Sequence, residues 1–301
     1  MPIRFTFWSS STRPSSSSSY HAFRLFRVRV RIHLLSPVLA LLVMKIVQYL
    51  FKVVLWADLV SKTTHPTAHA RISAVVSQFS MTRRILRLGH VNEPYAELRD
   101  LIVHEGGLRG TVLKPGLSVK ERFVQVLAWY NPAAGIVNDV VDDTICLAKM
   151  GAIDKSWAKR LDMTSTRLWF STILVDLYDN YRGQQKLTAD VARKRRDLAT
   201  LNAQALAYPS PASSPIMTPS SSSSASPSPI QEQIRTARTA LQAAEFKLWM
   251  QRVSFAKLMA DFAFCWVDFR QLSGHRADGV QAVAGFCAAL LGTYKIWVKC
   301  R

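Results

Sequence analysis

The chain has 301 residues, of which 49% are hydrophobic, and it carries a formal net charge of +19. Its lysines and arginines flank apolar segments, and the sequence contains no zinc-finger spacing, helix-turn-helix signature or basic patch interleaved with aromatic residues, which argues against nucleic acid as a partner. Bases placed in this way favour an anionic membrane surface. The four cysteines have no paired spacing, and the sequence predicts no catalytic, cofactor or metal site.

Residues 1–43 form a Ser/Arg-rich tail without Asp or Glu, and the last part of the tail is apolar. This composition is typical of a targeting peptide, either a secretory signal or a mitochondrial presequence, but no small-x-small cleavage site follows the apolar run. The alternative that we prefer is a disordered tail leading into a helix. An alternative start or a wrong gene model would also produce such a segment.

The segment Met44 to Val60 is predicted to be an amphipathic helix, because Lys45, Gln48 and Lys52 recur at i, i+3 and i+7. Lys45 and Lys52 can extend their ammonium groups to phosphate while the apolar side packs on protein or on acyl chains. The sequence leaves open whether this helix lies in the membrane interface or joins a helical bundle.

The next predicted helix, Ala70 to Leu88, follows a break at Pro66 and ends at Gly89. His65 and His69 have a helical metal-ligand spacing, but Pro66 directly follows the first and no nearby Cys or carboxylate completes a site. A basic amphipathic helix is typical of membrane surfaces, although the solvated face of a bundle helix has the same pattern. The predicted membrane-binding residues of these two helices are Lys45, Lys52, Ile72, Val75, Val76, Phe79, Arg83, Arg84, Leu86 and Arg87.

Residues 100–120 are predicted to form a loop. A helical pattern follows from Val119 to Trp129, stops at Asn131-Pro132 and resumes from Ile136 to Lys149. Carboxylates gather on one face of the second of these helices, and we expect them to face water or to meet nearby bases: Asp139, Asp142 and Asp143.

Four further helices are predicted from their composition and apolar periodicity: Met163 to Tyr181, Lys186 to Ala207, Gln231 to Arg252 and Ser254 to Leu272. Arg182-Gly183 is expected to close the first of them. A Pro/Ser tract at 208–229 cannot bury enough apolar surface to become ordered, so we predict a disordered linker there.

The final segment, Gly279 to Val298, is predicted to span a membrane, because it contains no carboxylate and a single base. A helix of this length crosses a hydrocarbon core of about 30 Å, and Tyr294 and Trp297 lie where interfacial aromatic residues belong. The alternative is a buried helix of a soluble all-α domain. One face of the span has small side chains and predicts close packing against another helix, with self-association of the chain as the expected result. The helix-packing residues on this face are Ala284, Ala288 and Gly292.

The predicted fold is therefore all α: a membrane-associated helical bundle with amphipathic helices and at least one C-terminal transmembrane helix. No stretch alternates apolar and polar residues in the way of a β-strand. The chain divides into the tail 1–43, a half made of amphipathic and apolar helices at 44–207, the linker 208–229, and C-terminal helices ending in the span at 230–301.

Short motifs run through the chain in a defined order: Lys45, Gln48-Tyr49 and Lys52; Arg83-Arg84 to Gly89; Asp142-Asp143; Trp157 to Arg160; Arg167-Leu168-Trp169; and Asp176-Leu177-Tyr178. In this order they resemble the peroxisomal biogenesis factor 11 family of peroxisomal membrane proteins. The resemblance covers about residues 44 to 300 and departs from the family pattern at Cys146, where an aromatic residue is commoner.

This resemblance implies a peroxisomal membrane protein, not an enzyme, that curves the membrane to elongate peroxisomes and promote their fission and proliferation. The implied partners are the phospholipid membrane with its anionic lipids, further copies of the chain and the fission machinery, with 44–207 as the membrane-remodelling half. The alternative is a pore or metabolite carrier of the peroxisomal or mitochondrial membrane, since carboxylates within a membrane often mark pathways. Such a carrier would be built around Asp176, Asp261 and Asp268.

Overall fold

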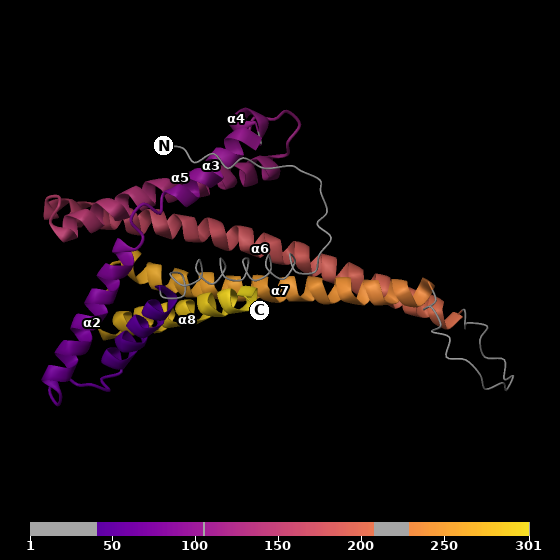
Figure 1. The fold of residues 1–301 in the computed structure, drawn as a ribbon. Helices are drawn as coiled ribbons and strands as arrows, with labels where there is room; N and C mark the ends of the chain where they lie inside the picture. Colours follow the sequence, from indigo (N-terminus) through magenta and orange to yellow (C-terminus); the bar gives the residue numbers. More distant parts are fainter. Residues whose placement is uncertain (1–40, 105, 208–228, 301) are drawn as a thin grey trace, which may run out of the picture.

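The computed structural model describes residues 41–104, 106–207 and 229–300, and over these residues the fold is all α, as the sequence predicted (Figure 1). The predicted tail and linker lie outside the described residues, apart from 41–43 and Pro229. The helices are an unlabelled first helix over residues 41–56, α2 (Pro66–Ile85), α3 (Asn92–His104), α4 (Gly107–Gly110), α5 (Val119–Met150), α6 (Lys155–Ala207), α7 (Pro229–Phe269) and α8 (His275–Cys300).

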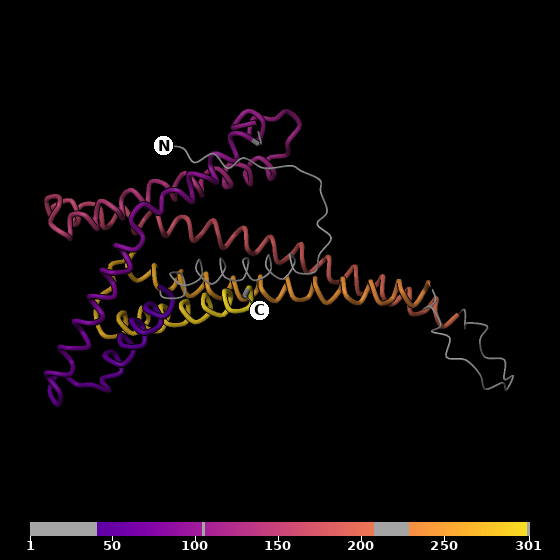
Figure 2. Tube along the Cα trace, viewed as in Figure 1, coloured from indigo at the N-terminus to yellow at the C-terminus, as the bar shows by residue number. Residues whose placement is uncertain are grey.

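Helix α6 is central, with α5 packed along one side and α7 along the other (Figure 1). Helix α8 packs on α7, and helix 41–56 lies beside α8 from Gly279 to Gly292 (Figure 2). At the far end, residues 188–207 of α6 and 229–248 of α7 continue together as a two-helix arm, whose small core consists of Val191, Ala244 and Leu248. The predicted linker connects the two helices of this arm.

The ends of the helices follow from local sequence. Pro66 occupies the first turn of α2, where a missing backbone N–H costs nothing. Ser118 and Glu121 form a capping box at the start of α5, in which each side chain accepts a hydrogen bond from the other residue's backbone N–H. Gly151 ends α5 with φ of 85°, a left-handed conformation that glycine adopts without steric cost.

Helix α5 is continuous, so the interruption predicted at Asn131-Pro132 is wrong. Pro132 removes one backbone donor from the helix, but it is buried, and the two residues directly before it contact α6. Tyr130 Oη and Ser171 Oγ are 2.6 Å apart, and Asn131 Nδ2 donates to Asp176 Oδ1 at 2.7 Å. Packing against α6 therefore outweighs the local helix-breaking tendency.

Helix α6 is also continuous, and the end predicted at Arg182-Gly183 is wrong. A Cβ atom on Gly183 would lie 2.8 Å from Gln251 Nε2, so the glycine serves close approach to α7 rather than chain reversal. Gln251 uses that approach to donate to the carbonyl of Asn180 at 3.4 Å. Helix α7 likewise joins two predicted helices into one, and the predicted loop at 100–120 contains the end of α3 and the short α4.

An aromatic cluster joins α6 to α7. Phe170 of α6 stacks on Phe269 of α7 with ring centroids 4.5 Å apart, and it also contacts Phe262 and Trp266. Such ring pairs contribute about 0.5–1.5 kcal/mol each beyond the area that they bury. This cluster fixes the part of α7 on which α8 is packed.

Candidate membrane-binding site

Helix α8 has two different faces, and its inner face packs against helix 41–56. A Cβ atom on Gly285 would collide with the ring of Tyr49, and one on Gly279 would collide with Trp56. Trp56 Nε1 donates to the carbonyl of His275 at 2.9 Å. Glycine at both positions therefore lets the two helices approach closely.

The three helix-packing residues predicted on α8 belong to this inner side. Ala284 and Ala288 are buried. A methyl group on Gly292 would lie 3.7 Å from Lys257 Cε of α7 and 4.0 Å from Leu42 Cδ2 of helix 41–56. The small face is thus covered within a single chain, so a surface for pairing two copies has to be sought elsewhere on α8.

The outer face of α8 is an exposed apolar stripe, which we call the outer stripe. Its members recur at spacings of three and four residues, so they share one side of the helix. They cover 17 residues of rise, or about 25 Å, close to the thickness of a hydrocarbon core. Among the described helices, only α8 is long and apolar enough to cross a membrane by length and composition. The outer stripe consists of Val280, Val283, Cys287, Leu290, Tyr294 and Trp297.

The carboxyl end of α8 carries a small aromatic belt. Trp249 Nε1 of α7 donates to Tyr294 Oη at 3.2 Å, and the ring of Tyr294 lies 6.2 Å from that of Trp297. Lys299 follows in the last turn of α8. Aromatic residues backed by bases are typical of the level at which a helix leaves a membrane.

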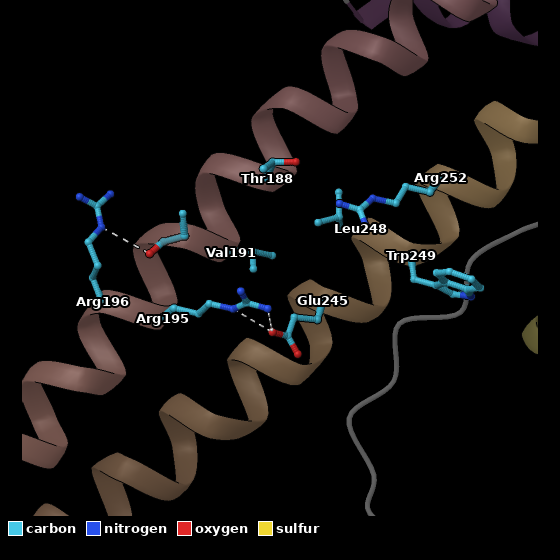
Figure 3. Close-up of a pocket in the computed structure, with 9 residues that line it drawn as sticks. Thr188, Val191, Arg195, Arg196, Glu245, Leu248, Trp249 and Arg252 are labelled. Carbon is cyan, nitrogen blue, oxygen red and sulfur yellow. Dashed lines mark hydrogen bonds and ion pairs between the residues drawn. The ribbon is translucent and has the colours of Figure 1, made fainter.

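Trp249 also lines a groove of about 590 Å³ between α6 and α7, at the base of the arm (Figure 3). Arg195 of α6 reaches across this groove to Glu245 of α7, with its Nη2 2.7 Å and its Nε 3.1 Å from the same carboxylate oxygen. Arg196 and Arg252 also line the groove, so its lining carries three arginines against one carboxylate. The groove therefore extends the basic character of this end of α8 onto the arm.

Four bases lie near one another, and we call them the basic cluster: Lys45 and Lys52 of helix 41–56, Arg83 in the last turn of α2, and the exposed Arg87 just after α2. Lys52 Nζ lies 5.2 Å from the centroid of the Tyr49 ring, and Arg83 Cζ lies 5.6 Å from it. Both are cation–π distances. The sequence placed these bases on two separate helices, and it named Tyr49 only as part of the family motif Gln48-Tyr49. The signal that marks the phenol is its place beside Gln48 in the helix that carries both lysines.

The basic cluster is compensated only at a distance, by Asp261 acting on Lys45 and by Asp268 and Asp278 acting on Lys52. Among the described residues, none of its four members forms a salt bridge. Burial lowers the pKa of Lys45 to about 8, with Asp261 opposing the shift and the charge of Arg83 adding to it. Burial likewise lowers the pKa of Lys52, and again the charge of Arg83 adds to the shift. Arg84 lies apart from the cluster, near Lys149, whose pKa is lowered by burial first and by Arg84 second.

The predicted apolar face of α2 is not absorbed into the core. No residue of α2 is buried. Ile72, Val76 and Phe79 are partly exposed, while Val75 and Leu86 are 36% and 56% exposed. These side chains are available to another apolar phase, close to the bases Arg83 and Arg84 in the last turn of α2.

A family model described as peroxisomal biogenesis factor 11 (PEX11) matches residues 43–297. The chain belongs to the PEX11 family. Comparison with curated proteins and with solved structures gives no match. The matched range includes helix 41–56 from its third residue, the basic cluster and the whole outer stripe.

Membership in the PEX11 family makes this chain a peroxisomal membrane protein of peroxisome biogenesis, as the motif order predicted. The family is one of biogenesis factors and not a family of enzymes. The candidate span and the basic cluster are the features of the PEX11 chain that suit such a location, because the first fits a bilayer core and the second fits anionic phosphate.

The acidic face of α5 has a structural role in this PEX11 chain, which the sequence did not predict. Asp143 Oδ2 accepts a hydrogen bond from the backbone N–H of Gly89 at 3.1 Å, and Asp139 lies 3.5 Å from His90 Nδ1. Asp142 accepts a hydrogen bond from Ser165 of α6 at 2.6 Å. The carboxylates thus hold the α2–α3 turn and α6 on α5. Partners so distant in sequence leave no local pattern.

The carboxylates on which a carrier would depend are engaged by neighbouring side chains. Asp176 accepts from Asn131 at 2.7 Å, and Asp261 pairs with Lys257 at 2.7 Å. Asp268 accepts a hydrogen bond from Gln281 of α8. Each therefore joins a pair of helices or stabilises its own helix, and none of them lines the groove beside Arg195.

Proposed function

We propose that this PEX11-family chain binds and curves the peroxisomal membrane, so that peroxisomes elongate before fission and proliferate. The observation that carries the proposal is α2, whose apolar side chains stay unburied in the folded bundle, while its last turn carries Arg83 and Arg84 and the exposed Arg87 follows directly after the helix. Apolar side chains inserted at acyl depth under basic head groups expand one leaflet and bend it. Each base near anionic lipid contributes about 1 kcal/mol.

Helix α8 supports this proposal as an anchor. Its outer stripe suits acyl chains, while its inner face holds helix 41–56 and, through Tyr49 and Arg83, the end of α2. Because α2 is attached to an anchored bundle, its apolar face acts as a wedge that stays at the membrane at high local concentration. Weak insertion of each α2 is then sufficient. Self-association of the chain and contact with the fission machinery are further parts of the proposal, which rest on the family.

The test is reconstitution of the purified full-length chain with vesicles that contain anionic lipid. We expect tubules by electron microscopy, and no tubules with vesicles of zwitterionic lipid alone, because the bases then lack a partner. Release of a trapped small solute, measured on the same vesicles, distinguishes the carrier alternative. Solute release without tubulation would overturn the proposal.

A further inference from the structure

Two polar atoms are buried without a hydrogen-bond partner among the described residues: Gln48 Oε1 and Arg83 Nε. Gln48 is only 1% exposed, and helix geometry puts it one turn from Lys45 and one turn from Lys52 on the same face. Arg83 belongs to the basic cluster and lies over the Tyr49 ring. A buried acceptor and a buried donor, both unused, are therefore carried by the two helices whose bases meet at the Tyr49 ring.

We propose that the basic cluster, with Gln48 and Tyr49, is a binding site for a hydroxyl-bearing phosphate, either the headgroup of an anionic phospholipid or a soluble phosphate compound. The inference rests on the proposed function in one respect, because the same bases are proposed to meet the membrane. It goes further in assigning them a defined ligand.

The chemistry of the site matches such a ligand on both of its sides. Arg83, Lys45 and Lys52 are donors only, and they suit the anionic oxygens of a phosphate group. Tyr49 Oη is a further donor at the same place. Gln48 Oε1 is an acceptor, so it needs a hydroxyl group on the ligand. Sulfate, which has no hydroxyl group at neutral pH, satisfies the cations but not Gln48.

Asp261, Asp268 and Asp278 favour the charged lysines of the cluster, but none of these carboxylates forms a salt bridge with a member of it among the described residues. Asp261 is paired with Lys257 at 2.7 Å, and Asp268 bonds to Gln281. Burial lowers the pKa of Arg83, as it does those of the two lysines. An anion bound among these groups reverses that effect, since it supplies the opposite charge that the protein does not.

The position of the site decides how a ligand reaches it. Tyr49 contacts α8 at Gly285, ten residues or about 15 Å along the helix from His275, so the site lies beside the middle of the candidate span. It is on the inner side of α8, away from the outer stripe, and Arg83 in the last turn of α2 lies over the Tyr49 ring. A lipid headgroup would have to be drawn in from the membrane surface under α2, whereas a soluble phosphate would enter from the aqueous side of α2.

The experiment is a titration of the full-length chain in detergent micelles with inorganic phosphate. The buffer itself contains no phosphate, and thermal unfolding at each phosphate concentration is the readout. We expect a saturable rise in the melting temperature, and a sulfate response at least about tenfold weaker in affinity. Arg83→Gln together with Lys52→Gln should abolish the phosphate response. Arg71→Gln is the matched control, because Arg71 is an exposed base on the same helix, 12 residues from Arg83.

Gln48→Leu gives a second, independent readout. It should remove the preference for phosphate over sulfate while leaving the sulfate response, since the cations remain. Repeating the titration in nanodiscs identifies the source of the ligand: phosphatidylglycerol that occupies the site weakens phosphate binding relative to phosphatidylcholine, and equal affinity in both lipids assigns a soluble ligand.

A non-saturable phosphate response, or one that survives in the Arg83/Lys52 double variant, would overturn the site. The titration needs no bilayer, so its failure would leave the proposed membrane curvature untouched. Loss of vesicle tubulation with normal phosphate binding would contradict the proposed function alone.

Discussion

The ring of Tyr49 lies against Gly285 so closely that the smallest side chain on the glycine would strike it. Tyr49 is 7% exposed, and its ring also meets Phe264 of α7 edge-on at 5.8 Å. One residue of helix 41–56 therefore ties together three helices, and it holds Lys52 and Arg83 on its ring as well. The anchor and the basic cluster share this residue.

Gly285→Ala should loosen the bundle. The added methyl group displaces the Tyr49 ring, and overpacking of this kind costs about 1–3 kcal/mol. Gly292→Ala is the matched control, because its methyl group would meet its nearest neighbours at 3.7 and 4.0 Å, which are ordinary contacts. Removing a helical glycine should then be neutral or stabilising by up to about 1 kcal/mol. Thermal unfolding in detergent compares the two, and equal melting temperatures would contradict the close contact.

Charges on the outer stripe of α8 should release the chain from membranes. Val283→Asp with Leu290→Asp places two carboxylates at the candidate span, and each costs about 2.5–3.5 kcal/mol near the centre of a membrane helix. We expect the native chain to resist alkaline carbonate and the double variant to be extracted. Ala203→Asp with Leu206→Asp adds the same charges to exposed positions of the arm and should remain in the pellet. Extraction of the native chain itself would show that α8 does not span.

The wedge role of α2 predicts a loss of membrane bending when its apolar face is charged. Val76→Glu with Phe79→Glu should abolish vesicle tubulation and the rescue of peroxisome elongation in cells that lack the protein, because the carboxylates oppose insertion and anionic lipid. Ser73→Glu with Ser77→Glu puts the same charge on the exposed side of the same helix and should cost much less. Full rescue by the first variant would reduce α2 to a bundle element.

Self-association through the outer stripe is testable by oxidation. Cys287 is exposed on the stripe, whereas Cys146 and Cys265 are buried. If two copies meet there, mild oxidation in membranes should give a disulfide-linked dimer that Cys287→Ser abolishes, in a background where Cys300 is also replaced by Ser. A dimer detected by a lysine cross-linker but not through Cys287 would place the contact outside the stripe and leave the stripe to lipid.

Lys45 makes stability depend on pH. Its folded pKa of about 8 lies below the value of 10.5 for an unperturbed lysine, so between these pH values the unfolded chain binds the extra proton. Stability in phosphate-free buffer should therefore rise as the pH increases from about 8 to about 10. Lys45→Met should stabilise the chain at pH 7 by on the order of 2 kcal/mol and reduce this slope. In this variant some dependence of stability on pH should persist, because the pKa of Lys52 is lowered too. If Lys45→Met left the slope of stability against pH unchanged, Lys45 would be solvated in the folded chain.

Periodicity and composition were sufficient for the helices and the candidate span, because both depend on the order of residues within one segment. They failed at Pro132 and Gly183, where contacts with another helix decide whether a helix continues. They also could not show that Arg83 lies over Tyr49, which is 34 residues away in sequence. The sequence predicted the bases of the site as two separate basic faces. That the two faces meet depends on how the chain brings the end of α2 back to helix 41–56.

Helix α6 runs without a break for 53 residues, or about 80 Å, and is shared by the α5 side of the bundle and by the arm. A continuous helix of this length behaves as a stiff beam, and near its far end Arg195 and Glu245 brace it against α7. A tilt of about 5° at one end moves the other by about 7 Å, more than the rise of one helical turn. Small reorientations of the bundle in a bending bilayer are thus converted into large displacements at the tip of the arm. A neighbouring molecule in contact with the tip would be displaced by them.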